Sequence, residues 1–231
     1  MLSRYQIYAR GVPLEHSGVR VKQWYIENIG GKIMKHIVIA GDSIFDNGAY
    51  VPGEQDVHQQ LKDIAGTTTE VTSMAVDGSV TDDTIMQLTK LPSTTTHLFI
   101  STGGNDALGQ IGLLSESVQS VAEAMLLLSK SQNQFRIKYR NLISQIQRSP
   151  NTKTVVCTIY HPNAEAERQC VMDIGVSLFN DVIIEETNKA HIPVLDIRGI
   201  FLNPEDYANE IEPSAIGGWK LANTMYSISA K

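Results

Sequence analysis

Cysteine is scarce in this chain, and its two cysteines, Cys157 and Cys170, do not form a C-x-x-C pair. Their spacing therefore excludes the usual zinc and redox motifs. Cys157 lies within the apolar run TVVCTIY, which predicts a small buried side chain rather than a reactive thiol. Nothing in the sequence supports a disulfide between the two.

Long apolar runs and basic clusters are also lacking. No stretch approaches the roughly 18 apolar residues of a membrane span, and the N-terminus lacks the apolar run of a secretory signal. The formal net charge is -6 without a basic stripe, which argues against nucleic acid or an anionic membrane as a partner. We therefore expect a cytoplasmic protein with a small-molecule partner, whose oligomeric state the sequence leaves open.

The length of 231 residues favours one domain with at most a short appendage. Residues 1–33 show neither clear periodicity nor strong strand patterning, whereas Met34 is followed at once by the run KHIVIAGDS. We expect residues 1–33 to be an extension outside the core, and residues 34–231 to form the domain.

Apolar runs typical of strands alternate with helical patterns after Met34. This alternation predicts a parallel sheet covered on both faces, which gives a three-layer α/β/α sandwich of flavodoxin-like topology with five strands. The predicted strands are HIVIAG, EVTSMAV, HLFIST, TKTVVCTIY and IPVLDIR. The predicted helices are a first ending at Gly66, a second beginning at Thr81, two broken near Ser129–Ser131 within 113–147, one over 165–189, and a last with Pro213 in its first turn.

Small and hydrogen-bonding residues follow four of these predicted strands. Because ligands bind outside the carboxyl ends of the strands in an open parallel sheet, the candidate site is expected at this edge. The residues concerned are Gly41-Asp42-Ser43, Asp77-Gly78, Gly103-Gly104-Asn105-Asp106 and Tyr160-His161-Pro162. No glycine-rich phosphate loop and no metal-ligand spacing occurs among them.

The order of these blocks resembles the SGNH/GDSL hydrolase family. The matching blocks are GDSIFDNGAYV, AVDGSVT, STGGNDAL and NEIEPSAIGGWKLA. The resemblance implies an ester hydrolase with Ser43 as nucleophile, which works through an acyl-serine intermediate and needs no cofactor. It further implies an oxyanion hole built from the backbone N–H groups of Ser43 and Gly78 and the side-chain amide of Asn105.

The last block departs from the family pattern, which has Asp-x-x-His with the histidine as base. Asn209 and Glu212 stand at those two positions. Three interpretations follow. Glu212 is itself the base, with a pKa raised by burial; or His161, the one histidine expected at a carboxyl end of a strand, is the base and Glu212 orients it; or the base is lost.

Two other functions are compatible with the same three-layer fold. The first is a non-catalytic protein that binds an ester or carbohydrate ligand on this scaffold without turnover. The second is a flavodoxin-like nucleotide or flavin binder, which the absence of a phosphate cradle disfavours. Activation of Ser43 separates the hydrolase from both, because a serine hydroxyl is inert without a base and an oxyanion hole.

Overall fold

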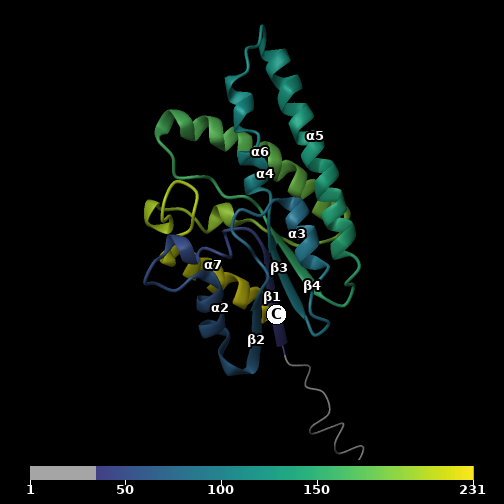
Figure 1. Cartoon of the computed structure of the whole chain (residues 1–231), viewed down its shortest axis with the longest axis vertical. Helices are drawn as coiled ribbons and strands as arrows, with labels where there is room; N and C mark the ends of the chain where they lie inside the picture. Colours follow the sequence, from purple (N-terminus) through teal and green to yellow (C-terminus); the bar gives the residue numbers. More distant parts are fainter. Residues whose placement is uncertain (1–34, 231) are drawn as a thin grey trace, which may run out of the picture. The chain divides into compact units, whose positions relative to one another are not determined.

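The computed structural model describes residues 35–230, in which five parallel strands form one sheet in the order β2-β1-β3-β4-β5. β1 is an inner strand, which pairs with β2 on one side and β3 on the other (Figure 1). This arrangement confirms the predicted α/β sandwich. The strands are β1 (Lys35–Gly41), β2 (Thr69–Ser73), β3 (His97–Ser101), β4 (Lys153–Cys157) and β5 (Val194–Leu195).

Helices cover both faces of the sheet. Successive side chains of a strand point to opposite faces, so Ile37 and Ile39 of β1 pack with α2 and α7, while Val38 and Ala40 pack with α3, α5 and α6. The helices are α2 (Val57–Ala65), α3 (Thr81–Leu88), α4 (Gly104–Leu108), α5 (Val121–Ile146), α6 (Ala166–Lys189) and α7 (Ala215–Ser229). Short 3₁₀ turns are η1 (Gly48–Tyr50), η2 (Gly66–Thr68), η3 (Ile111–Ser115), η4 (Ile197–Gly199) and η5 (Pro204–Asp206).

Side-chain caps explain where several helices begin. Asp56 accepts a hydrogen bond from the Gln59 N–H at 2.7 Å at the start of α2. Ser120 does the same for α5, and Ser214 for α7. Each cap satisfies a backbone donor that has no partner within its helix. Gly66 ends α2, as the sequence predicted.

Three details of the predicted elements are wrong. α5 runs unbroken through Ser129–Ser131, because serine costs a helix well under about 1 kcal/mol and packing against α6 continues along it. Pro213 precedes the Ser214 cap and so lies outside α7. The last strand shrinks to Val194 and Leu195 at the edge of the sheet.

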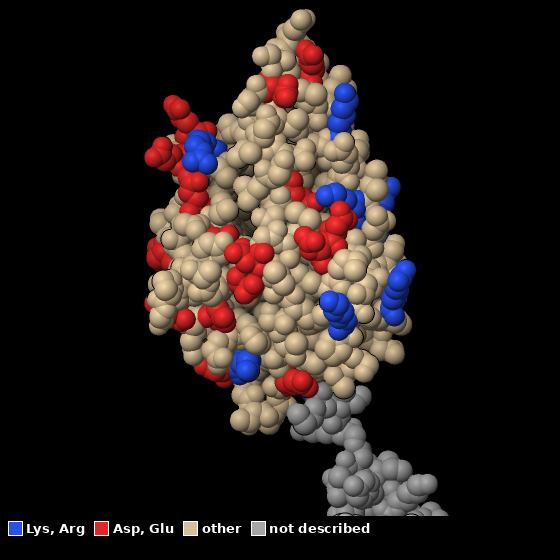
Figure 2. All heavy atoms as spheres, in the orientation of Figure 1, with Lys and Arg blue, Asp and Glu red and all other residues tan. Residues whose placement is uncertain are grey.

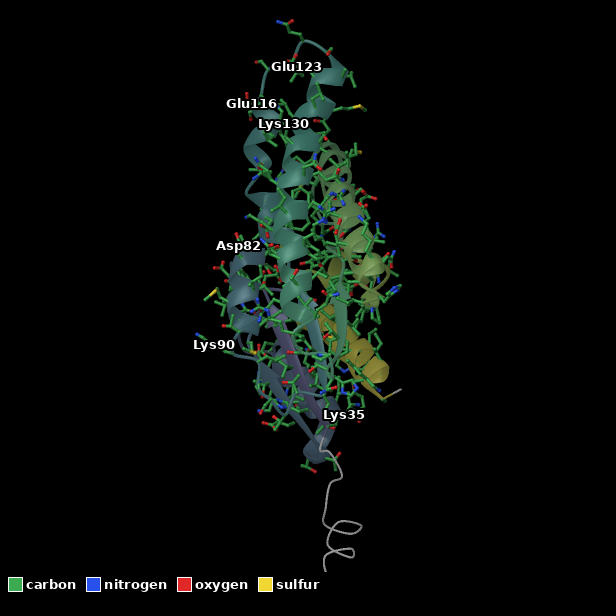
Figure 3. All side chains as sticks on the ribbon, turned by 90° about the vertical axis from the view of Figure 1, so that its right-hand side faces the viewer. Lys35, Asp82, Lys90, Glu116, Glu123 and Lys130 are labelled. Atoms are coloured by element: carbon green, nitrogen blue, oxygen red, sulfur yellow. The ribbon has the colours of Figure 1, made fainter. Side chains whose placement is uncertain are left out.

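In the folded part of the molecule that the structure describes, residues 35–230, β1 begins at one end and α5 begins at the other. Figure 3 places Glu116, Glu123 and Lys130, around the start of α5, at the end opposite Lys35 of β1. None of the helices in this segment combines the length and apolar character needed to cross a bilayer. Both cysteines are free, Cys157 buried and Cys170 exposed. The predicted extension, residues 1–33, lies outside the described residues.

Gly41, at the end of β1, has no room for a side chain. Its φ is +132°, and a Cβ built there would lie 1.7 Å from the Ser101 carbonyl oxygen of β3. The Asp42 N–H donates to this same carbonyl at 3.2 Å. The close approach of β1 and β3 therefore sets the path of the chain into Ser43.

Replacing Gly41 with alanine should lower the free energy of unfolding by about 3 kcal/mol or more, because it combines a steric clash with backbone strain. Urea denaturation measures this. Gly53→Ala is the matched control, since Gly53 has φ +84° with no atom within 4 Å of its built Cβ, and strain alone should cost about 1–2 kcal/mol. Equal losses in the two variants would contradict the steric account.

Candidate active site

Ser43 lies in the turn that follows β1, at the carboxyl edge of the sheet. Its side chain is largely buried, with 7% of the residue exposed. The Asp42 carboxylate accepts a hydrogen bond from the Ile44 N–H at 3.3 Å, and the Phe45 and Asp46 N–H groups donate to the Asp42 carbonyl. These bonds fix the turn that carries Ser43.

The Ser43 hydroxyl donates a hydrogen bond to Oε1 of Glu212 across 3.1 Å. Glu212 is itself buried, with 5% exposed, and its second oxygen, Oε2, has no hydrogen-bond partner among the described residues. Two residues 169 positions apart are thus brought together by the fold. A serine and a buried carboxylate at this distance satisfy the geometric requirement for a nucleophile and its base.

The loop that carries Glu212 is held from several directions. Asn209 uses its side-chain oxygen to accept the N–H groups of Ile211 and Glu212, both at 2.9 Å. The Ala208 N–H donates to the Glu212 carbonyl at 2.8 Å, and the Tyr160 hydroxyl donates to the Ile211 carbonyl. Asn209 therefore shapes the backbone around Glu212, and its side-chain oxygen is occupied there.

The environment of Glu212 favours its protonated form. Burial raises the pKa of Glu212 to about 7, the Asp77 charge adds to this, and the Ser43 hydrogen bond opposes it. Burial likewise raises the pKa of Asp42 to about 7, with the Glu212 charge contributing. A carboxyl group with a pKa of about 7 can take up or release a proton at neutral pH. A general base works best when its pKa lies near the working pH.

Asn105 lies at the start of α4, directly after β3, and lines the same pocket as Ser43 and Glu212. Its amide donates to the Ser79 carbonyl at 3.0 Å. An amide carries two N–H donors, so one is left for a ligand. Asp106 does not orient Asn105. It accepts the Thr81 N–H and hydroxyl, both at 2.8 Å, and a bond from Lys138 at 3.1 Å.

Gly78 lies in the exposed loop between β2 and α3, next to the Ser79 carbonyl that holds Asn105. Its φ of +78° is a conformation that glycine adopts without strain. No atom lies within 4 Å of a Cβ built at Gly78, and Gly78 is not among the residues that line the pocket of Ser43. The neighbouring Asp77 accepts the Tyr50 hydroxyl at 2.9 Å, and its N–H donates to Asp46 at 2.9 Å.

His161 has a different partner from the one considered in the sequence analysis. Its Nδ1 lies 2.8 Å from Oδ1 of Asp173 on α6, and its side chain is 39% exposed. The pocket that Ser43 and Glu212 share is lined by the flanking Tyr160 and Pro162 but not by His161. The structure thus brings Ser43, Asn105 and Glu212 together and leaves His161 paired with Asp173.

The site opens into a pocket with a volume of about 150 Å³, which no pattern in the sequence had indicated. Beyond the polar residues already described, it is lined mostly by apolar side chains of α4, η3, α5 and α6. On the face shown in Figure 2, acidic side chains gather around the middle, whereas much of the upper part carries neither sign of charge. Within residues 35–230, no three His, Cys, Asp or Glu side chains come together as a metal site.

Comparisons with known proteins identify the family and the fold of this chain. A model of the GDSL-like lipase/acylhydrolase family matches residues 39–217. No curated protein sequence matches the chain. Among solved structures, an extracellular lipase from Streptomyces rimosus is similar at 17% identity and a TM-score of 0.63, covering 84% of this chain and 99% of the lipase.

Two further solved structures share the fold. A phospholipase A1 from Streptomyces albidoflavus has 18% identity and a TM-score of 0.59, with 86% of this chain and 99% of that chain covered. A lipase/acylhydrolase from Enterococcus faecalis has 20% identity and a TM-score of 0.59, with 85% and 96% covered. At these identities the likeness concerns the fold.

The raised pKa of Glu212 has a consequence for stability. Since the folded protein binds this proton more tightly than the unfolded chain does, its stabilising contribution is present below pH 4.5, the ordinary value, and is lost as the pH rises to about 7. Glu212→Gln should therefore gain stability relative to the unmodified protein at about pH 8 and gain little at about pH 5.

Thermal unfolding of both proteins at the two pH values measures this difference. Glu210→Gln is the control, because the Glu210 side chain is 41% exposed and pairs with Arg168, so its carboxylate keeps contact with water. A Glu212→Gln effect of the same size at both pH values would contradict the burial of an ionisable carboxyl.

Proposed function

This chain belongs to the GDSL-like lipase/acylhydrolase family, and on that basis we propose that it hydrolyses a carboxylic ester through an acyl-serine intermediate on Ser43. We propose Glu212 as the base in place of the family's histidine. The observation that carries this proposal is the 3.1 Å hydrogen bond from the Ser43 hydroxyl to Oε1 of the buried Glu212.

The first half of the reaction forms the acyl-enzyme. Ser43 Oγ attacks the ester carbonyl carbon while its proton passes to the Glu212 carboxylate, which gives a tetrahedral oxyanion and a neutral Glu212. The oxyanion collapses, the bond to the alcohol oxygen breaks, and Glu212 returns its proton to the leaving alkoxide. In the second half, Glu212 takes a proton from water as the water attacks the acyl carbon, which gives a second tetrahedral oxyanion. The bond to Ser43 Oγ then breaks, Glu212 returns its proton to Ser43, and the carboxylic acid leaves.

A carboxylate base changes the charge balance of the site. When histidine is the base, a cationic imidazolium forms beside the oxyanion and stabilises it. When Glu212 is the base, it becomes neutral as the oxyanion forms, so one negative charge moves from the carboxylate to the substrate. The N–H donors of the Asn105 side chain and of the Ser43 and Gly78 backbones must therefore stabilise more of the negative charge on the oxyanion.

Burial makes Glu212 basic enough for this role. A carboxylate with an ordinary pKa is a weak acceptor for a serine proton, whereas a pKa near 7 places its deprotonated and protonated forms in balance at neutral pH. No ion pair among residues 35–230 includes Glu212. A cation there would lower the pKa and weaken the base.

The base can be identified by paired substitutions. Glu212→Gln should lower kcat by a factor on the order of 10² to 10⁴, because it keeps the shape of the side chain and removes its basicity. His161→Ala should leave kcat near that of the unmodified protein. In the unmodified protein, activity should rise as the pH passes through the pKa of Glu212, about 7, because the carboxyl group then loses its proton.

Hydrolysis of a chromogenic ester series measures these rates, with Ser43→Ala as the inactive control. A large loss in His161→Ala together with retained activity in Glu212→Gln would reverse the assignment. If no ester is hydrolysed and Ser43→Ala binds ester ligands as well as the unmodified protein, the chain is a binding protein on this scaffold.

Asn105 is proposed as a donor to the oxyanion. Asn105→Ala should lower kcat by a factor on the order of 10² to 10³ with little change in KM, because the bond forms fully only in the transition state. Asp106→Asn is the control for the neighbouring position, since Asp106 bonds to Thr81 and Lys138. Unchanged kcat in Asn105→Ala would remove it from the oxyanion hole.

A further inference from the structure

The pocket beside Ser43 extends away from the polar residues into an apolar channel. α5 and α6 pack against each other beside α4 (Figure 1), and side chains from all three helices line the pocket. The apolar lining includes Leu108 of α4, Leu113 of η3, Leu128 of α5, and Val171, Val176 and Phe179 of α6. Such a lining suits a hydrocarbon chain, whose burial is favourable in proportion to its apolar area.

The α6 wall of the channel is buried at one end and exposed at the other. Phe179 is buried against Phe135, with ring centroids 4.7 Å apart, whereas Val171 is 44% exposed. These two lining residues are eight positions apart, which corresponds to about 12 Å along a helix.

Gly175 stands in the middle of this wall. A glycine inside a helix is less favourable than an alanine. The backbone does not require glycine here, because its φ is not positive and a built Cβ would meet no atom within 4 Å. What the missing side chain provides is free volume in the channel.

We propose that the channel holds the acyl chain of the ester, an unbranched hydrocarbon chain, and that Gly175 determines the length of chain that fits. This inference rests on the proposed hydrolysis at Ser43. A Cβ at Gly175 would meet no atom within 4 Å, and we expect a larger side chain there to occupy part of the channel and to shorten the chain that fits.

The acyl rather than the alcohol portion is assigned to the channel for a mechanistic reason. The alcohol leaves in the first half of the reaction and water must then reach Ser43 and Glu212. The acyl portion stays attached to Ser43 through both halves, so an enclosed apolar site suits it. The exposed loop at Asp77 and Gly78 gives the alcohol a polar path to solvent.

Gly175→Leu tests the role of this position. The ratio of kcat/KM for methyl decanoate over methyl butyrate should fall by about tenfold or more, since the added side chain takes the place of buried methylene groups. Ser177→Leu is the matched control, because Ser177 is exposed on the same helix and does not line the channel. Gly175→Ala should shift the ratio in the same direction by less, and its helix should be no less stable.

Reversed esters separate the acyl assignment from an alcohol site. Methyl decanoate should be hydrolysed faster than decyl acetate, and only the former should respond strongly to Gly175→Leu. Faster hydrolysis of decyl acetate, or an unchanged decanoate-to-butyrate ratio in Gly175→Leu, would overturn the proposal while leaving hydrolysis at Ser43 intact.

Binding to the Ser43→Ala variant keeps the test independent of turnover. Decanoate should bind this variant more tightly than butyrate, and adding Gly175→Leu should remove the difference. If this pattern appears but no ester is hydrolysed, the proposed hydrolysis fails and the channel assignment stands. If decanoate and butyrate bind alike, the channel assignment fails.

Discussion

The hydrogen bond between Ser43 and Glu212 is the interaction on which the site depends. It joins the turn after β1 to the loop before α7, and each side is fixed by its own backbone contacts. Gly41 allows β1 to approach Ser101 closely, which positions the turn that carries Ser43. On the other side, the Asn209 side-chain oxygen accepts a hydrogen bond from the Glu212 N–H at 2.9 Å. Asn209 therefore contributes to the site through the shape of the loop, although it occupies the position where the family has a charged partner.

Burial connects this bond to chemistry. A carboxyl group without a cation and with one oxygen unpaired is costly to ionise, which is why the pKa of Glu212 rises to about 7. The same burial that weakens the folded state above neutral pH makes the group a usable base. Stability and basicity at this position are thus opposite consequences of one environment.

Much of the fold follows from local patterns, whereas the site follows only in part. Alternating apolar runs predict the sheet because its inner strands, β1, β3 and β4, are largely buried on both faces, and strand ends predict that Ser43 and Asn105 share an edge. The pairing of His161 with Asp173 depends on how α6 lies over the sheet, and no spacing in the sequence encodes it. The channel is harder still, since its walls come from separate helices whose packing leaves the space, and only the isolated Gly175 within a helical pattern hints at it.

Reaction of Ser43 with a fluorophosphonate probe across pH tests the central claim most directly, because labelling requires an activated serine but no particular substrate. The account predicts that mass mapping finds the label on Ser43, that labelling accelerates as the pH rises through about 7, and that Glu212→Gln removes this acceleration and slows labelling strongly above that pH. Labelling that is absent, or that persists at full rate in Glu212→Gln, would contradict the role of Glu212 as the base for Ser43.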